Sequence, residues 1–305
     1  MLTEGCAQSR ISTPRPVVVE IAGATSMRPM LEEMARAFTE RHPSVLIELR
    51  GGGSALGEER VLNGRSSIAA STLFPATENA ESQIEIATGR RAQTTGATPA
   101  ANQRQAPRAG DANPLVWAPI GIDGIAIVVH PDNPVAAFTS RQLQDIFRGR
   151  VLDWSELNGE EGEIVLVSRE EGSGVREAFE ERIMGDKAVS LTAVVMPTSA
   201  DVIDFVSKNR WAIGYVSTAY TTTPSAGVTP VPSVDDEPAP NAVQVASLDG
   251  VLPSDRAIRD QSYLLIEPLY LVTRGVPQGW TRQFIDFALS PAGQEIVDHY
   301  HVPVR

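Results

Sequence analysis

The sequence predicts an α/β fold with mainly parallel sheets. Short runs rich in β-branched residues alternate with stretches of helical periodicity along most of the 305 residues. This length exceeds the usual size of one domain, so it favours two domains or one large one. Hydrophobic residues make up 42% of the chain and charged residues 21%, as in ordinary globular proteins.

The N-terminal part contains three predicted strands, residues 17–21, 45–49 and 68–70. Between the first two, apolar residues recur at helical spacing over residues 30–38. Thr25 or Ser26 would cap this helix, and Pro29 fits its first turn. A second helix is expected to begin at the glycines and serine of residues 51–54.

The remainder of the chain continues the alternation. Its predicted strands are residues 125–130, 164–167, 212–215 and 268–273. Its predicted helices are residues 139–147 and 199–208, one that follows the Gly-Ser-Gly turn at residues 172–174, and two near the C-terminus, of which the last begins at Ser290. The same α/β pattern therefore extends to the C-terminus.

Two internal segments and the N-terminus depart from this pattern. Residues 88–114 are polar, rich in Pro and Gly and without periodicity, so we expect a mobile surface insertion there. Residues 221–256 have a similar composition with some strand-like pieces. The first 16 residues are expected to form a disordered tail.

The single cysteine, Cys6, excludes an internal disulfide. No apolar stretch typical of a secretory signal peptide precedes it, although Gly5-Cys6 resembles the end of a bacterial lipoprotein signal. Cys6 is therefore either a site of lipid attachment or a free cysteine in the tail. No run approaches the roughly 18 apolar residues that a membrane helix needs.

The net charge of −12 argues against nucleic-acid binding, which requires a basic face. Lysine occurs only as Lys187 and Lys208, so arginine supplies almost all of the cations. A fixed cation in an anion-binding site is therefore expected to be an arginine.

Three loops share one design, in which a strand ends, small or hydroxylated residues follow, and a helix begins. They are residues 22–26 (A-G-A-T-S), 51–54 (G-G-G-S) and 171–174 (E-G-S-G). A helix N-terminus offers free N–H groups and a positive dipole end, and glycine lets a ligand approach the backbone. With Arg169 just before the third loop, this pattern predicts a binding site for an oxyanion.

No pattern indicates a catalyst, a metal site or a cofactor site. Gly52 and Gly57 are not followed by the lysine of a P-loop, and no glycine cluster matches the dinucleotide-binding pattern. Ser54 and Ser173 lack the glycine spacing of a nucleophile elbow, and the four histidines lack the spacing of a metal site. We therefore expect no catalytic residue, no metal ion and no cofactor.

Several blocks of the sequence, taken in order, resemble one family. They are G-A-T-S from Gly23, G-G-G-S from Gly51, P-I-G-I-D-G-I-A-I-V-V-H-P-D-N-P from Pro119, L-Q-D-I-F-R-G-R-V-L-D-W-S-E-L from Leu143, V-L-V-S-R-E-E-G-S-G-V-R-E-A-F from Val165, P-L-Y-L-V-T from Pro268 and F-I-D-F-A-L-S-P-A-G-Q from Phe284. On these blocks the chain resembles the phosphate-binding protein of bacterial phosphate ABC importers, from about residue 17 to residue 305.

This resemblance implies a two-lobed, periplasmic-binding-protein-like fold of the doubly crossed kind (type II), with a ligand cleft between the lobes. Lobe one would contain residues 17–122 and 262–305, and lobe two would contain residues 123–261. The ligand would contact both lobes only when they close. It would therefore shift the population toward the closed shape that a transporter recognises.

The resemblance also implies a set of ligand-binding residues. Those on lobe one are Thr25, Ser26, Ser54, Ser71 and Thr72, and those on lobe two are Arg169, Ser173, Gly174 and Val175. Glu171 would pair with the Arg169 guanidinium and hold it in place, whereas Glu170 would be solvated.

Two positions depart from the family pattern. Thr72 stands where many members have an acid, which accepts the proton of hydrogen phosphate and repels a fully ionised anion such as sulfate. Val175 stands where a threonine hydroxyl is common, although its backbone N–H remains available. Both departures leave open which oxyanion binds.

The function that the resemblance implies is that of a bacterial solute-binding protein, not an enzyme. It would be periplasmic or extracytoplasmic, bind inorganic phosphate as a monomer and deliver it to the permease of an ABC transporter. The alternative is a binding or sensing module for another tetrahedral oxyanion, such as sulfate, molybdate or tungstate, that is not dedicated to import. A phosphate-releasing hydrolase is disfavoured because the sequence shows no metal cluster or activated nucleophile.

Overall fold

The structure, a computed structural model, describes residues 16–75, 115–221 and 243–304. Its strands are β1 (Val17–Gly23), β2 (Val45–Arg50), β3 (Ile68–Ser71), β4 (Leu115–Val129), β5 (Ala137–Phe138), β6 (Val165–Arg169), β7 (Val194–Met196), β8 (Ala212–Ser217), β9 (Gln244–Leu248), β10 (Ile266–Arg274) and β11 (Val302–Pro303). Its α-helices are α1 (Arg28–Arg41), α2 (Gly53–Leu62), α4 (Ser140–Phe147), α5 (Gly174–Phe179), α6 (Ser199–Lys208), α7 (Asp255–Arg259), α8 (Gly279–Ala288) and α9 (Pro291–Asp298). The expected insertion at residues 88–114, the tail with Cys6 and most of the polar stretch from residue 221 lie outside the described residues.

The predicted strands and helices are present, but the sheet is mixed rather than mainly parallel. The main path of the sheet runs β2-β1-β3-β10-β4-β8-β6-β7, while β9 and β11 pair with β4 and β5 pairs with β9. Among the described strands, each antiparallel pair includes β4 or β10. The flanking pairs β1–β2, β1–β3, β6–β7 and β6–β8 are parallel. The expectation of a mainly parallel sheet is wrong at the centre of the sheet, because β4 and β10 run antiparallel to each other and to their other neighbours there.

β4 is much longer than the predicted strand at residues 125–130. Its first part pairs with β10, from Leu115 to Gly124, and its last part pairs with β8 and β9, from Ile125 to Val129. The ladder with β10 is irregular near Pro119, which has no N–H to donate. The sequence did not predict this half of the strand, because Pro119 and the neighbouring glycines have low β-strand propensity.

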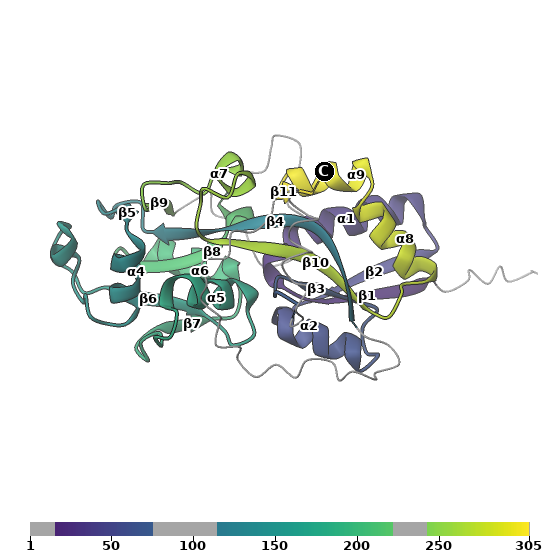
Figure 1. The fold of residues 1–305 in the computed structure, drawn as a ribbon, viewed down its shortest axis with the longest axis horizontal. Coiled ribbons are helices and arrows are strands. Elements are labelled where there is room, and N and C mark those ends of the chain that lie inside the picture. The colour runs from purple at the N-terminus through teal and green to yellow at the C-terminus, as the bar shows by residue number, and fades with distance from the viewer. Residues whose placement is uncertain (1–15, 76–114, 222–242, 305) are drawn as a thin grey trace, which may run out of the picture.

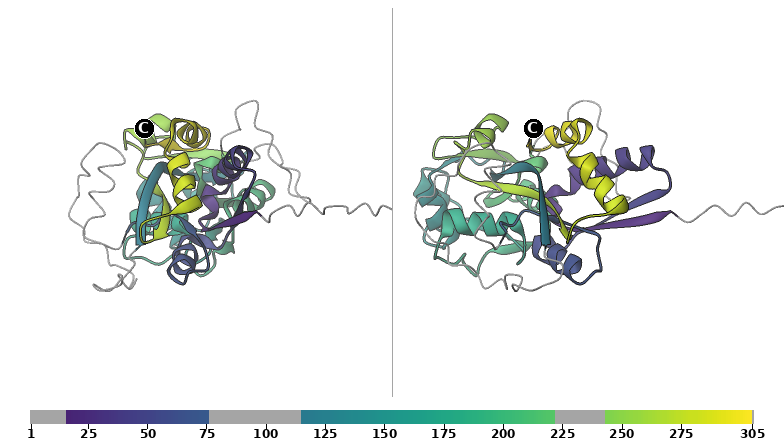
Figure 2. Two further views of the ribbon diagram at one scale, coloured as in Figure 1. Left: turned by 90° about the vertical axis from the view of Figure 1, so that its right-hand side faces the viewer. Right: turned by 45° about the vertical axis from the view of Figure 1, so that its right-hand side comes forward.

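The molecule has two lobes, and β4 and β10 run between them (Figure 1). The two largest of the five hydrophobic clusters among the described residues contain, respectively, Phe38, Ile120, Leu269 and Phe284, and Ile125, Phe147, Phe179, Tyr215 and Leu265. In the first lobe, α8 and α9 pack against α1 although they lie at the opposite end of the chain (Figure 2). No helix in the described ranges is long and apolar enough to span a membrane.

The start of α1 differs from the prediction in a way that matters for the site. Pro29 lies in the first turn, as expected, but neither Thr25 nor Ser26 caps the helix. The two residues form a separate 3-10 turn, Thr25–Met27, and Met27 occupies the N-cap position without a side-chain hydrogen bond. The Thr25 hydroxyl is engaged elsewhere, because it accepts a hydrogen bond from Arg169.

Candidate functional site

Arg169 is the cation of the candidate site. It is the last residue of β6, and its side chain is only 1% exposed. Its guanidinium donates to the Ser199 hydroxyl at 3.0 Å, to the Thr25 hydroxyl at 3.1 Å and to the Pro197 carbonyl at 3.2 Å. These fixed partners hold the planar group in one orientation.

The carboxylate that pairs with Arg169 is Glu170, and the predicted pairing with Glu171 is wrong. Oε2 of Glu170 accepts from Arg169 Nε at 2.9 Å, and Oε1 accepts from Nη2 at 3.1 Å, so the pair is bidentate. Glu171 is exposed and acts electrostatically on Arg176 instead. β6 ends at Arg169, so Glu170 is the first residue beyond the strand, and its carboxylate lies beside the guanidinium.

Ser54 and Thr72 form a buried pair of hydroxyl groups on the first lobe. Ser54 Oγ lies 3.4 Å from Thr72 Oγ1 and accepts a hydrogen bond from the Thr72 N–H at 3.1 Å. Ser26 is also buried, in the turn that follows β1. Ser71 is oriented differently, because its hydroxyl donates to the Glu58 carboxylate at 2.6 Å. Ser26, Ser54 and Thr72 are thus buried side chains of the first lobe, whereas the hydroxyl of Ser71, also buried, is bonded to Glu58.

The third predicted loop lies directly against the Ser54–Thr72 pair. A Cβ atom added to Gly174 would lie 1.7 Å from Thr72 Oγ1 and 3.1 Å from Ser54 Oγ, so only glycine permits this approach. A Cβ atom added to Gly53 would lie 2.7 Å from the carbonyl oxygen of Gly172. The two lobes therefore touch through backbone at the start of α2 and at the start of α5.

The remaining predicted residues of this loop use their side chains within the second lobe. Ser173 is the N-cap of α5, and its hydroxyl accepts the N–H of Arg176 at 3.5 Å. Val175 is 1% exposed, and its side chain belongs to the hydrophobic core of the second lobe. Only the backbone of Val175 is thus available to a ligand.

Three residues that the sequence reasoning missed complete the surroundings. The Tyr220 hydroxyl donates to the Thr25 carbonyl at 2.8 Å, and burial raises the pKa of this tyrosine. Asp123 and Glu267 are fully buried and lie opposite each other on β4 and β10. Each acid interrupts an otherwise apolar strand, in P-I-G-I-D-G-I-A-I and in I-E-P-L-Y-L-V-T, and this is the signal that could have identified them.

The arrangement suits a tetrahedral oxyanion. One buried guanidinium, several hydroxyl groups and the first N–H groups of two helices lie together, and all of these groups donate hydrogen bonds. Within the described ranges, no group of three or more His, Cys, Asp or Glu residues could hold a metal ion. These donors are of the kind that an oxyanion accepts, which makes this cluster the candidate site.

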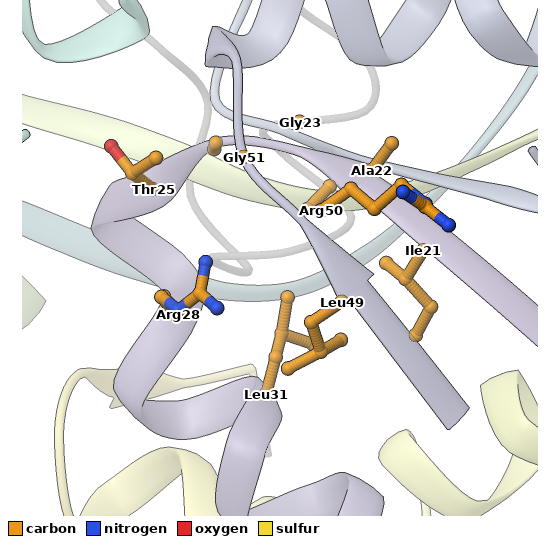
Figure 3. A pocket seen from close by; sticks show the side chains of 11 residues that line it. Ile21, Ala22, Gly23, Thr25, Arg28, Leu31, Leu49, Arg50 and Gly51 are labelled. Carbon is orange, nitrogen blue, oxygen red and sulfur yellow. The ribbon is translucent and has the colours of Figure 1, made fainter. Parts of the chain in front are cut away.

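A small pocket adjoins the Thr25 turn on the first lobe (Figure 3). Its lining is mostly apolar and consists of Ile21, Ala22, Gly23, Ala24, Thr25, Arg28, Leu31, Leu49, Arg50, Gly51 and Ala70. Its two arginines are already paired, Arg28 with Glu32 at 2.8 Å and Arg50 with Glu20 at 2.6 Å. The pocket shares Thr25 and Gly51 with the predicted binding loops, and both of its arginines are held in ion pairs.

Phosphate-binding proteins of bacteria resemble the chain over most of its length. The phosphate-binding protein PstS of Bacillus subtilis is 27% identical over 286 residues, which cover 93% of this chain and 80% of that protein. A Clostridium perfringens protein, described as a phosphate ABC transporter substrate-binding protein and solved with bound phosphate, is 29% identical. Its TM-score is 0.72, and the match covers 94% of this chain and all of that chain.

The fold extends to more distant structures, and a family model covers nearly the whole chain. An ABC-type phosphate transport receptor from Vibrio cholerae has a TM-score of 0.64 at 23% identity, covering 93% of this chain and 99% of that one. Residues 10–292 match the model of the PBP superfamily domain. The chain therefore belongs to the PBP superfamily, and within it resembles the binding proteins of phosphate ABC transporters.

Proposed function

We propose that the protein is an extracytoplasmic solute-binding protein that captures inorganic phosphate between its two lobes and delivers it to the permease of an ABC importer. The observation that carries this proposal is the buried Arg169 guanidinium at the contact between the lobes, close to hydroxyl and N–H donors. The Bacillus subtilis and Clostridium perfringens relatives, both named for phosphate, support the choice of ligand.

The proposed binding residues come from four loops. They are Thr25, Ser26, Ser54, Ser71, Thr72, Arg169, Ser173, Gly174 and Val175. Val175 would act through its N–H, because its side chain lies in the core. Ser71 would have to release the Glu58 carboxylate before its hydroxyl could reach the anion, so we expect it to contribute least.

Capture would proceed by closure of two lobes, which we propose to be residues 17–122 with 262–305 and residues 123–261, although Tyr263 and Leu265 at the start of the last segment pack in the second core. Contacts already connect these parts in the structure. Arg169 and Tyr220 of the second part donate to the hydroxyl and the carbonyl of Thr25 in the first. A bound anion that accepts hydrogen bonds from both parts would add to these contacts and favour the closed state.

The proposed assembly is a monomer that docks on a permease. The proposed location is the extracytoplasmic side of a bacterial membrane, and attachment would be through a lipid on Cys6, which lies outside the described residues. Mass spectrometry of the protein purified from its native host would test the lipid. A Cys6 peptide without a lipid mass would exclude this attachment.

Isothermal titration calorimetry with phosphate, sulfate, molybdate and tungstate at one fixed pH tests the choice of ligand. We expect tight binding of phosphate, with a Kd on the order of micromolar or below, and weaker binding of the others. Binding of sulfate or molybdate without phosphate would refute the phosphate assignment. It would favour the alternative of a module for another oxyanion. That alternative is tested because position 72 is a threonine, not the acid that many relatives have there.

A further inference from the structure

Asp123 lies at the point where β4 passes from one lobe to the other. The strand pairs with β10 up to Gly124 and with β8 from Ile125 onward, so Asp123 is next to the change of partner. Its side chain is 0% exposed, although a carboxylate is costly to bury. Glu267, a second fully buried acid, lies directly opposite on β10. Packing alone does not explain an acid at this place in the fold.

One oxygen atom of Asp123 contacts two segments that are far apart in the chain. Oδ1 accepts a hydrogen bond from the Thr218 hydroxyl at 2.8 Å and lies 3.2 Å from Nδ1 of His301. The His301 side chain is also fully buried, and it comes just before β11, which pairs with β4 at Ile122. Asp123 thus connects the C-terminal segment of the first lobe to the turn that follows β8 in the second.

The turn that begins at Thr218 reaches the candidate site. It is a 3-10 turn that directly follows β8 and ends at Tyr220. The Tyr220 hydroxyl donates to the Thr25 carbonyl at 2.8 Å, and the Thr25 hydroxyl accepts from Arg169 at 3.1 Å. A continuous series of contacts therefore runs from Asp123 through this turn to the guanidinium of the site.

Thr218 is held against the crossing strands by both branches of its side chain. It is 5% exposed, and a Cβ atom added to Gly124 would lie 3.0 Å from its Cγ2 methyl group. Because threonine is branched at Cβ, a methyl group packed against β4 also fixes the direction of the hydroxyl. The hydroxyl then points to Asp123, which accepts its proton.

We infer that Asp123 is a positioning residue for anion binding, where its carboxylate attaches the turn from Thr218 to Tyr220 to the crossing strands and so places the Tyr220 hydroxyl against Thr25. This inference rests on the proposed function, because it concerns how the two lobes are held around the same anion. A hydrogen bond to a carboxylate is roughly twice as strong as one between neutral groups. It also sets a direction, which an apolar side chain at this position could not do.

The consequence for binding is faster release when the turn is loosened. The bond between Tyr220 and Thr25 joins the two lobes, so a turn that moves favours the open state, from which the anion leaves. Arg169 and the other donors remain in place, so the loss of affinity should be smaller than for the loss of Arg169. Association with the open state should change little, and the effect should therefore appear in the dissociation rate.

The experiment compares Thr218→Val and Thr218→Ser by calorimetry and stopped-flow release of phosphate. Valine keeps the branched shape without the hydroxyl, so we expect Kd to rise about threefold to tenfold, mainly through faster release. Serine keeps the hydroxyl and should stay within about twofold of the unmodified protein. Thr273→Val is the matched control, because the buried Thr273 hydroxyl donates to the Gly275 carbonyl at 2.9 Å near the other end of β10. It should lower the melting temperature without a change in Kd.

A double-mutant cycle with Tyr220→Phe separates positioning from general destabilisation. In the Tyr220→Phe protein the positioned contact is already lost, so Thr218→Val should change Kd by less than about twofold. Additive effects, or a Thr218→Val protein with unchanged Kd and release rate, would overturn the inference. If Thr218→Val does not fold, Asp123→Asn replaces it in the same cycle, and additivity has the same meaning there. Absence of phosphate binding in the unmodified protein would instead overturn the proposed function.

Discussion

Arg169 combines two properties that rarely occur together, full burial and a permanent charge. Its neighbour Glu170 balances that charge, and oxygen atoms of Thr25, Ser199 and Pro197 accept further hydrogen bonds from the guanidinium. The Arg169 guanidinium loses its hydration water when the protein folds, so an oxyanion that binds beside this pair does not have to remove that water. The cost of organising the site is therefore incurred before the anion binds.

We predict that Arg169→Ala weakens phosphate binding far more than Arg176→Ala. Loss of the guanidinium removes at least one charge-assisted hydrogen bond, worth about 1.5–3 kcal/mol, so Kd should rise by about 10-fold to 100-fold or more. Arg176 is a matched control, because it bonds to Glu180 at 2.7 Å and to the Arg169 carbonyl at 3.1 Å. Calorimetry on folded variants provides the comparison, and equal losses in the two would contradict the role of Arg169.

We predict that Glu170→Gln destabilises the anion-free protein and that Glu171→Gln does not. The first change leaves a buried guanidinium without its counter-charge and should cost about 1–3 kcal/mol of unfolding free energy, because Glu170 is partly exposed. The second changes an exposed side chain and should stay within about 0.5 kcal/mol. Urea unfolding measures both values.

Saturating phosphate provides the control for this pair of variants. The bound anion compensates the Arg169 charge, so the deficit of Glu170→Gln should shrink when phosphate is present. A deficit that is the same with and without phosphate would mean that the anion does not neutralise Arg169. A larger effect from Glu171→Gln than from Glu170→Gln would contradict the observed pairing.

The starts of α2 and α5 face each other across the contact between the lobes, and glycine makes this possible. Gly53 has φ = 83° and Gly172 has φ = 85°, values that glycine adopts without steric cost. Gly174 has no such dihedral requirement, so its role is the close approach to Thr72 alone. The two helix ends can therefore direct their N–H groups into one small volume.

We predict that Gly174→Ala weakens phosphate binding by hindering closure rather than by unfolding the second lobe. The added methyl group would overlap Thr72 Oγ1 on the other lobe, and opening of the lobes relieves that overlap. Calorimetry should show Kd raised by at least about tenfold, which corresponds to about 1.4 kcal/mol, with a melting temperature of the free protein near the original. A large fall in melting temperature with unchanged affinity would oppose this account.

Thr72→Ala provides a double-mutant test of the same contact. It removes the oxygen that lies 1.7 Å from the added Cβ and leaves the Thr72 Cβ at 3.0 Å. The double variant should therefore lose less affinity than the sum of the two single changes. Strict additivity would show that the two positions do not meet in the bound state.

The sequence was sufficient to predict the elements that carry the loops but not the partners across the molecule. Arg169 and Gly174 could be identified because they lie in a strand-turn-helix pattern that is local in the chain. The choice of Glu170 over Glu171 depends on the residue at which β6 ends, and such a boundary is uncertain by a residue or more. Glu267 acquires its neighbour Asp123 only through the register of β10 on β4, which no local pattern encodes.

The crossing strands show the same limit for the complete fold. β4 contains Pro119, Gly121 and Gly124, so its first half has poor strand propensity. It is extended because β10 pairs along it, and tertiary pairing outweighs local preference there. One pair of antiparallel strands thus links the two cores and also carries Asp123 and Glu267 beside the site. A change of angle between the lobes would move these acids relative to the loops.

Closure should depend on contacts that never touch the anion, and two tyrosines allow a matched test. Tyr220 donates to the Thr25 carbonyl between the lobes at 2.8 Å, and Tyr263 donates to the Ile125 carbonyl near the core of the second lobe, also at 2.8 Å. Both changes to Phe remove one buried hydrogen bond worth about 1 kcal/mol. Tyr220→Phe should therefore raise the phosphate Kd about fivefold and speed dissociation, whereas Tyr263→Phe should lower unfolding free energy with Kd unchanged. Stopped-flow release and urea unfolding measure these quantities, and equal effects of the two variants on Kd would show that the Tyr220 contact does not stabilise the closed state.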